Sequence, residues 1–387
     1  MGQLLRKKLP FLSIAFSVFL LSSCATKDDR LFDENEKQAN DLVEVFKLDE
    51  KNFNKFKVTK IAKKKTVAQS KVEEKKETAL KNTPKKKINK KVKSKPVPEQ
   101  KKVSETLPAI KQENVQKDLS VVKTNPNFIY PDDYPEIYKD YDRESKKTWK
   151  KRSPLFYEGE EFTIAVRYLG ITAGHIKLQS RGRVMLGDKE AYHVKGILKS
   201  ASFYEYVYKL EDTVETFMAT DNLIPLKYTL FQRESGQNVD DLQVFDQDKL
   251  KTYFWYKRVK DGKIKKREKN EYIPRYFQDS FSALYFARGL PLKIGDEYRF
   301  PVVTRAKLWM LKMKVDKRES IVVNGKKYDA LKIKAETRFP GVLKKKGDII
   351  FWYSADETRK LLKFEAKVKI GAIEGELINY KTGDKIE

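Results

Sequence analysis

The sequence has few of the residue types on which most enzymatic chemistry depends. Its 387 residues include one cysteine, Cys24, and two histidines, His175 and His193. A single thiol excludes an intramolecular disulfide and a thiolate metal cluster, and the two histidines would need carboxylate ligands to hold zinc. Because apolar and charged side chains alternate around them, we expect both histidines to be solvated residues of strands.

Recognisable catalytic motifs are also missing. The sequence contains no glycine-rich phosphate loop and no nucleophile-elbow pattern. The acidic pairs Glu160-Glu161 and Asp240-Asp241 lie on expected strands, where adjacent side chains point to opposite faces and cannot cooperate as glycosidase carboxylates do. We interpret both pairs as surface charge. The sequence therefore predicts a protein that is not an enzyme, with no catalytic residues, no metal site and no cofactor.

Hydrophobic runs long enough to cross a bilayer are absent after the N-terminus. Residues 11–21 form an apolar run, interrupted by two serines, behind the basic residues 6–8. This run has the length of a secretory signal and is too short for a comfortable membrane span. The motif Leu-Ser-Ser-Cys at residues 21–24 follows, and the whole resembles a bacterial lipoprotein signal peptide over residues 1–23.

The lipoprotein resemblance implies cleavage before Cys24, lipidation of Cys24 and attachment to a membrane through its acyl chains. Each buried acyl methylene contributes about 0.8 kcal/mol, so several chains would hold the protein stably. Ala25 in place of an aspartate resembles the export-permitting pattern of enteric bacteria. We therefore expect the periplasmic side of the outer membrane, with the inner membrane as the alternative. A simple secretion signal with an incidental cysteine is the competing interpretation.

Positive charge is concentrated in one tract. The net charge of the chain is +27, and residues 51–102 hold 20 lysines against 4 glutamates. Residues 24–125 therefore read as a lipidated N-terminus followed by a disordered lysine-rich linker. The lysines could keep the linker solvated, or they could contact anionic cell-wall polymers or lipid headgroups. The secretory signal argues against a third possibility, nucleic-acid binding, so we expect no nucleic-acid partner.

Two flanking segments carry more apolar residues than a linker needs. Asp33 and Glu36 form a capping box ahead of a helical face that includes Leu42 and Phe46. This segment could be a fraying helix without a partner or an element that docks. Residues 126–153 are rich in aromatic residues and proline, and we expect them to lie against the following domain as a strap.

From residue 154 to 387 the pattern is that of strands. Residues 362–370 alternate strictly between apolar and charged side chains. Asn324-Gly325, Asp261-Gly262 and Gly187-Asp188 mark hairpin turns. These signals predict a single all-β domain, built as one curved antiparallel sheet or a barrel-like sheet.

One stretch of this domain predicts a helix instead. Asp279 is a suitable N-cap, and Gly289 with Pro291 ends the run. Phe281, Leu284, Tyr285 and Arg288 fall on one face. We expect a three-turn helix that caps one end of the sheet.

Aromatic residues are the strongest hint of a binding function. Tyr204, Tyr206 and Tyr208 alternate as they would on one strand face, and residues 253–256 are aromatic on both faces. Such rings could form core, or they could line a groove for acyl chains or sugars. The candidate ligand-facing residues are Tyr204, Tyr206, Tyr208, Phe254, Trp255 and Trp309.

Three motifs carry a family resemblance. Residues 157–174, 279–288 and 351–377 resemble, in order, the opening, the central helix and the closing hairpin of the bacterial domain of unknown function 3108. The resemblance implies a secreted or envelope β domain and carries over no functional residue. Our leading hypothesis is a noncatalytic binding module for an envelope lipid or glycan. An adaptor linking membrane, cell wall and a protein partner is second, and a hydrolase with an unfamiliar site is third. The sequence leaves the oligomeric state open.

Overall fold

The computed structural model describes most of the chain beyond residue 127 and a short N-terminal part. The described residues are Leu42, Phe46, Leu48 and residues 53–61, 128–153, 155–206, 208–337, 347–368 and 370–386. Cys24, the expected signal peptide and most of the lysine-rich linker lie outside them. No helix within these ranges has the length and apolar character needed to cross a membrane.

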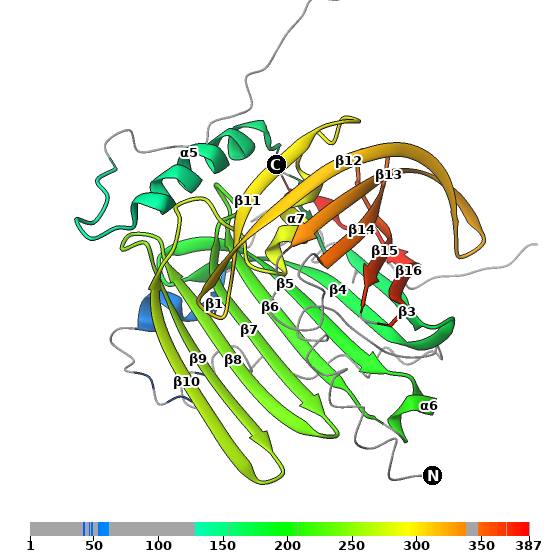
Figure 1. Ribbon diagram of the computed structural model, residues 1–387, viewed down its shortest axis with the longest axis horizontal. Coiled ribbons are helices and arrows are strands. Elements are labelled where there is room, and N and C mark those ends of the chain that lie inside the picture. The colour runs from blue at the N-terminus through cyan, green and yellow to red at the C-terminus, as the bar shows by residue number, and fades with distance from the viewer. Residues whose placement is uncertain are drawn as a thin grey trace, which may run out of the picture. The chain divides into compact units, whose positions relative to one another are not determined.

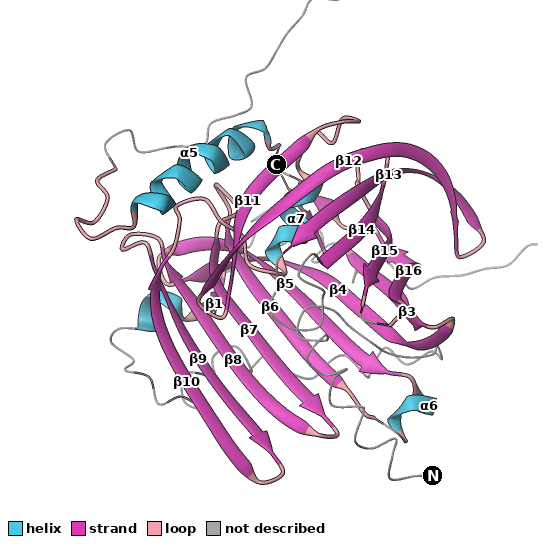
Figure 2. Cartoon of the chain, viewed as in Figure 1, coloured by secondary structure: helices cyan, strands magenta, loops and turns pink. Residues whose placement is uncertain are grey.

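One antiparallel sheet of 15 strands dominates the described structure. Its strands follow the order β10-β9-β8-β7-β6-β5-β4-β3-β16-β15-β14-β13-β12-β11, with β1 paired to β4 beside this path. The sheet is open, because β10 and β11 lie at its two ends and do not pair with each other (Figure 2). The expected all-β fold with a single antiparallel sheet is therefore confirmed.

The strand bounds show long hairpins. The strands are β1 (Val58–Lys60), β3 (Glu161–Tyr168), β4 (Ile171–Leu186), β5 (Lys189–Ser200), β6 (Glu211–Ala219), β7 (Pro225–Glu234), β8 (Gln237–Asp246), β9 (Lys251–Lys260), β10 (Lys263–Tyr272), β11 (Glu297–Thr304), β12 (Lys307–Val323), β13 (Lys326–Thr337), β14 (Gly347–Ser354), β15 (Leu361–Lys367) and β16 (Ala372–Lys381). A small second sheet pairs β2 (Tyr157–Glu158) with β17 (Asp384–Lys385).

The sheet consists of two successive meanders. Strands β3 to β10 pair in chain order, as do β11 to β16, and β16 returns to pair with β3. The predicted turns at Gly187-Asp188, Asp261-Gly262 and Asn324-Gly325 all join paired strands. Positive φ at Asp261 and Gly262 matches the type I′ turns that two-residue hairpins favour.

The predicted helix is present as α7 (Ser282–Arg288), between the two meanders (Figure 1). The Asp279 carboxylate accepts hydrogen bonds from the backbone N–H groups of Phe281 and Ser282, both at 2.7 Å, so Asp279 serves as the predicted cap. The helix has seven residues, so the expectation of three turns was wrong. It is also buried on nearly every side, because both meanders pack against it.

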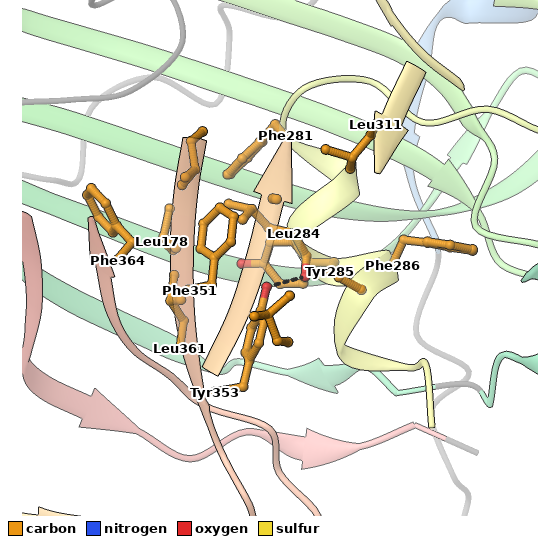
Figure 3. Packing of buried hydrophobic residues seen from close by; sticks show 14 of the residues in the cluster. Leu178, Phe281, Leu284, Tyr285, Phe286, Leu311, Phe351, Tyr353, Leu361 and Phe364 are labelled. Atoms are coloured by element: carbon orange, nitrogen blue, oxygen red, sulfur yellow. Dashed lines mark hydrogen bonds between the residues drawn. The ribbon is translucent and has the colours of Figure 1, made fainter. Parts of the chain in front are cut away.

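The main core forms around α7. Figure 3 shows Phe281, Leu284 and Phe286 beside aromatic and aliphatic side chains of both meanders. The Tyr353 hydroxyl donates a hydrogen bond of 3.2 Å to the carbonyl oxygen of Leu284, which ties β14 to the helix (Figure 3). The two ends of the sheet do not pair with each other, and the short buried helix α7 fills the interior between the meanders.

A second core lies on the opposite face of the first meander. Its sheet residues include Phe217, Phe231 and Trp255, and the N-terminal residues Leu42 and Phe56 cover them. The ring of Phe53 meets that of Trp255 edge-on, with centroids 4.9 Å apart. Leu42 therefore docks on the domain, as one of the two alternatives for its segment expected, whereas the capping-box residues Asp33 and Glu36 lie outside the described residues.

The N-terminal cover also joins the sheet. After the 3₁₀ helix η2 (Asn54–Phe56), strand β1 pairs with the end of β4 that β3 leaves free, placing Val58 opposite Leu186. The expectation of a disordered linker was therefore wrong for residues 53–61. Composition misled here, because a few apolar side chains among many lysines suffice when a partner face is available to bury them.

The expected strap at residues 126–153 lies against the domain as a helix, α5 (Glu136–Lys151), which the sequence analysis did not predict. Trp149 is buried in the main core, and its indole N–H donates to the carbonyl oxygen of Asn222 at 3.0 Å. The prolines that argued against regular structure precede the helix, and Pro135 is its N-cap residue.

Candidate functional site

The candidate ligand-facing tyrosines do not share a strand face. Residues 201–210 form the connection from β5 to β6, closed by a hydrogen bond from Ser200 N–H to Leu210 O, and they contain the short helix α6 (Ser202–Glu205). Tyr206 follows this helix and is 94% exposed, whereas the hydroxyl of Tyr208 donates to the carboxylate of Glu234. The alternating pattern of tyrosines therefore misled us about the local structure.

The other candidates are also separated. Trp255 belongs to the second core beneath Phe53, whereas Phe254 is buried on the opposite face of β9. Trp309 is half-buried near the start of β12. The six candidate residues thus form no common groove. A cavity of about 30 Å³ lies between η2 and the end of β8, lined in part by Lys55, Phe56 and Asp246, and it has room for little more than a water molecule.

A different set of residues gathers on the free edge of the first meander. The pairing of β9 with β10 places Tyr256 opposite Arg267, Arg258 opposite Lys265, and Lys260 opposite Lys263. In an antiparallel pair, opposite residues point to the same side of the sheet. We call this surface the basic face; it consists of Tyr256, Arg258, Lys260, Lys263, Lys265, Arg267 and Lys269.

The charge of the basic face exceeds what an edge strand needs. Lysines on an edge strand discourage pairing with another chain, whichever side of the sheet they occupy. Here the other side of β9 and β10 carries three cations, Lys251, Lys257 and Lys266, and one anion, Glu268, whereas the basic face carries six cations beside one anion, Glu271. Like charges placed directly opposite each other also destabilise a sheet. The concentration of cations on one side therefore suggests a role other than edge protection.

Arg305 extends the basic face from the second meander. It lies in the turn between β11 and β12, where Arg305 and Ala306 adopt φ of 53° and 52°. Left-handed residues other than glycine or asparagine are costly in such a turn. Two contacts hold it on β8: the Arg305 N–H donates to Gln243 Oε1 at 2.9 Å, and Arg305 Nε donates to Asp241 Oδ2 at 2.6 Å.

The Tyr256 ring lies close to two guanidinium groups. Arg305 Cζ is 5.2 Å from the ring centroid and Arg267 Cζ is 5.9 Å from it, distances typical of cation–π contacts. Arg305 Nη2 and Arg258 Nε are buried and have no hydrogen-bond partner among the described residues. Guanidinium donors without a partner are suited to phosphate or carboxylate oxygens.

Asp241 is part of the same arrangement. Its side chain is 1% exposed, and burial raises the pKa of its carboxyl group even though Arg305 beside it acts in the opposite direction. Burial tends to lower the pKa of Arg305, but Asp241 outweighs this effect and raises it. The ion pair with Asp241 engages Nε of Arg305 and leaves the buried Nη2 without a hydrogen-bond partner.

Sequence reasoning missed this site, although part of the signal was visible. Lys263, Lys265, Arg267 and Lys269 recur at every second position, which is the period of one strand face. No such pattern in the sequence indicates that Arg305, which belongs to the second meander, lies on this face.

Several expectations about titratable groups were wrong. Glu160 and Asp241 are not surface charges, because both are buried in ion pairs with arginines. Burial lowers the pKa of His175 to about 4, so that histidine is not freely solvated. His193 stacks on Phe217 at 4.4 Å between ring centroids and lies 3.7 Å from Glu215. Within the described ranges, no group of three or more His, Cys, Asp or Glu side chains could hold a metal ion.

A buried acidic cluster adjoins the basic face. Gln232 Nε2 donates to Asp212 at 3.3 Å and to Glu234 at 3.0 Å. Burial, with a smaller contribution from the charge of Glu234, raises the pKa of Asp212 to about 7. Because these carboxylates are hydrogen-bonded by protein donors, we interpret the cluster as structural.

Fold and site together define an all-β protein with an open sheet and a basic face at its free edge. The chain belongs to the family described as protein of unknown function DUF3108, whose model matches residues 161–378. The family resemblance seen in the sequence is therefore confirmed. No curated protein matches the sequence.

Solved structures resemble this chain only distantly. A β-barrel-like protein of the domain of unknown function DUF1849 from Brucella abortus is 10% identical, covers 60% of this chain and all of its own, and has a TM-score of 0.38. The lipoprotein LppX of Mycobacterium tuberculosis is 12% identical, with 64% and 96% coverage and a TM-score of 0.17. Scores this low carry no argument about the function of this chain.

Proposed function

We propose that this protein is a noncatalytic binding module of the bacterial envelope, which holds an anionic group of a lipid or glycan on the basic face. The observation that supports this most directly is the buried Arg305 Nη2, which has no hydrogen-bond partner and belongs to a guanidinium 5.2 Å from the Tyr256 ring; Arg258 Nε on the same face also has no partner among the described residues. A phosphate or carboxylate there would use these donors and relieve the repulsion among the opposed cations.

The envelope assignment rests on the lipoprotein-like N-terminus. The signal-like residues 1–23 and Cys24 motivate attachment to a membrane, and we propose the periplasmic side of the outer membrane as its place. Envelope lipids and glycans offer phosphate and carboxylate groups, so both are sources of the same recognised chemistry. The adaptor hypothesis, in which the lysine-rich tether crosses or binds the cell wall and the domain docks a protein partner, is second, because residues 53–61 at the start of that tether pack on the domain.

The test is calorimetric titration of the full mature chain carrying Cys24→Ser. The ligands are dihexanoyl-phosphatidylglycerol, dihexanoyl-phosphatidylcholine and an oligogalacturonate, which separate an anionic lipid, a zwitterionic lipid and an anionic glycan. We expect one of the two anionic ligands to bind, and binding to weaken at least tenfold in Arg267→Ala and Arg305→Ala.

Two design features keep the titration decisive. Arg267 is exposed, so its replacement should leave the fold intact, whereas Arg305→Ala also leaves Asp241 buried without its partner. Lys266→Ala is the matched control, because Lys266 neighbours Arg267 but points to the other side of β10. Equal binding by wild type, Arg267→Ala and Lys266→Ala would refute the proposal, as would binding of neither anion.

A further inference from the structure

Exposed apolar side chains gather along one rim of the domain. Eleven large hydrophobic side chains are exposed among the described residues, and five of them lie in or directly beside three neighbouring connections. We call these five the apolar rim: Leu169 (64% exposed), Ile171 (56%), Phe203 (76%), Tyr206 (94%) and Ile370 (68%).

Strand pairing brings the three connections together. Tyr168 is paired with Ile171 across the β3–β4 turn and with Ile373 of β16, and its hydroxyl donates to Ile370 O at 3.0 Å. On the other side of β4, the Ala201 N–H ahead of α6 donates to Ala173 O at 3.0 Å. The rim residues from β3–β4, α6 and β15–β16 therefore belong to one continuous edge.

Leu169 shows that folding alone does not account for the rim. It adopts φ of 50° in the turn with Gly170, a conformation that favours asparagine or glycine and penalises leucine by about 1–2 kcal/mol. A leucine that is both strained and two-thirds exposed contributes little to stability. The strain points to a surface that something else covers.

We propose that the apolar rim inserts into the headgroup region of an anionic lipid bilayer. Exposed aromatic and aliphatic side chains at the tips of adjacent loops suit this region, where amphipathic rings lie at the boundary between headgroups and acyl chains. Charge complementarity supports the choice of occupant. Lys209 and Lys367 flank the rim, and the β9–β10 turn with Lys260 and Lys263 lies at the same end of the meander. Glu205 and Asp261 partly offset these cations.

The length of the N-terminal chain permits this geometry. Seventeen residues separate Cys24 from the docked Leu42, and a chain of that length can extend to about 60 Å. If Cys24 is acylated as we propose, the anchor and the rim can therefore reach the same membrane. Rim insertion would then bring the end of the basic face at the β9–β10 turn to the lipid headgroups. This inference rests on the proposed function and names a lipid surface as the source of the anion.

The test is flotation of the full mature chain carrying Cys24→Ser with vesicles of phosphatidylethanolamine and phosphatidylglycerol in a 3:1 ratio. We expect partitioning onto these vesicles, and a loss of at least tenfold in the double variants Phe203→Ser/Tyr206→Ser and Leu169→Asn/Ile370→Ser. Asparagine suits the conformation of residue 169, so the second variant should fold. Ile294→Ser and Val322→Ser are controls, since these exposed residues lie outside the rim (63% and 69%).

A site-specific probe complements flotation. Phe203→Trp should shift its emission to shorter wavelength on the vesicles and be quenched by brominated lipid. Absence of partitioning, or wild-type partitioning by both double variants, would overturn the proposal. So would a dimer of the wild type that the rim variants dissociate, because a second copy would then cover the rim.

The outcome is separable from that of the calorimetric test. Short-chain phosphatidylglycerol below its critical micelle concentration presents a headgroup without a bilayer. Rim variants should therefore bind it like the wild type even where they no longer float with vesicles, and loss of short-chain binding in Arg267→Ala reports on the basic face alone.

Discussion

Arg288 and Glu160 form a bidentate ion pair in which Nη1 and Nη2 each donate a hydrogen bond of 2.7 Å to one carboxylate oxygen. The two side chains are 3% and 0% exposed. Arg288 also donates to the carbonyl oxygens of Thr358 and Arg359, and the Tyr380 hydroxyl donates to Glu160 at 2.9 Å. Because Arg288 ends α7 and Glu160 precedes β3, the pair connects the buried helix to both meanders.

Removing one partner should therefore be far more damaging than removing both. Arg288→Met leaves a buried carboxylate without its cation, and we expect a loss of about 3–5 kcal/mol in the free energy of unfolding. The double variant Arg288→Met/Glu160→Gln should recover much of that loss, because no buried charge is left. Urea unfolding followed by tryptophan fluorescence measures both, and a single-variant loss below about 1 kcal/mol would contradict the argument.

The docking of residues 53–61 can be tested with two glycines in similar turns. Gly187 and Gly262 both have positive φ, 60° and 71°, so alanine strains either backbone. A Cβ on Gly187 would lie 2.6 Å from the carbonyl oxygen of Lys55, whereas one on Gly262 meets nothing within 4 Å. We expect Gly187→Ala to displace the N-terminal cover and Gly262→Ala to show only the cost of strain, about 1 kcal/mol.

Limited proteolysis separates these two outcomes. Lys55 and Lys57 are exposed, but their backbone is held on the domain, so displacement of the cover would free it for trypsin and accelerate cleavage in Gly187→Ala relative to Gly262→Ala. Equal cleavage rates in the two variants would mean that residues 53–61 do not depend on contact with the β4–β5 turn.

The acidic cluster predicts a pH dependence of stability. The pKa of Asp212 is raised from 3.8 to about 7 in the folded protein, chiefly by burial. The folded state therefore binds this proton more tightly than the unfolded state does. The stabilisation contributed by this proton is fully present below about pH 4 and is lost as the pH rises to about 7. The full effect is at most about 4 kcal/mol.

Replacement by asparagine should remove this dependence. We expect the free energy of unfolding of Asp212→Asn to fall less between pH 4.5 and 8 than that of the wild type. Glu234 faces Asp212 and also has a raised pKa, so part of the wild-type slope will persist. Asp261→Asn, in an exposed turn, should keep the whole slope. Parallel profiles for Asp212→Asn and wild type would contradict this interpretation.

The cap of α7 makes a further prediction. Asp279 is buried, and its second carboxylate oxygen accepts a hydrogen bond of 2.5 Å from the Thr216 hydroxyl. Asp279→Ala removes the acceptor for two backbone N–H groups and for Thr216, and we expect a loss of at least about 2 kcal/mol by thermal or urea unfolding. Asp279→Asn keeps one amide oxygen as an acceptor and should cost less. Equal losses for alanine and asparagine would argue that the carboxylate charge, not the cap, is what matters.

Hairpins and strands could be predicted from the sequence because their determinants are local. Asn324-Gly325 specifies its turn by permitting positive φ, and the alternation at residues 362–370 reports one buried and one wet face. Helix α5 was missed, because its apolar face is narrow and only contact with the domain buries Trp149. Tyr204 and Tyr206 were wrongly assigned to a strand, because their alternate spacing fits a strand although the chain turns there to connect β5 with β6.

By itself the sequence determined the all-β fold, the position of the capped helix and the alternation of cations on β10, since each depends on residues close together in the chain. Only the tertiary structure decided which face of β9 meets Arg305, that the lysine-rich tract begins with a docked strand, and that Glu160 and Asp241 are buried. These features depend on contacts between segments far apart in the chain. Burial changes the energy of a charge by more than any local pattern can report.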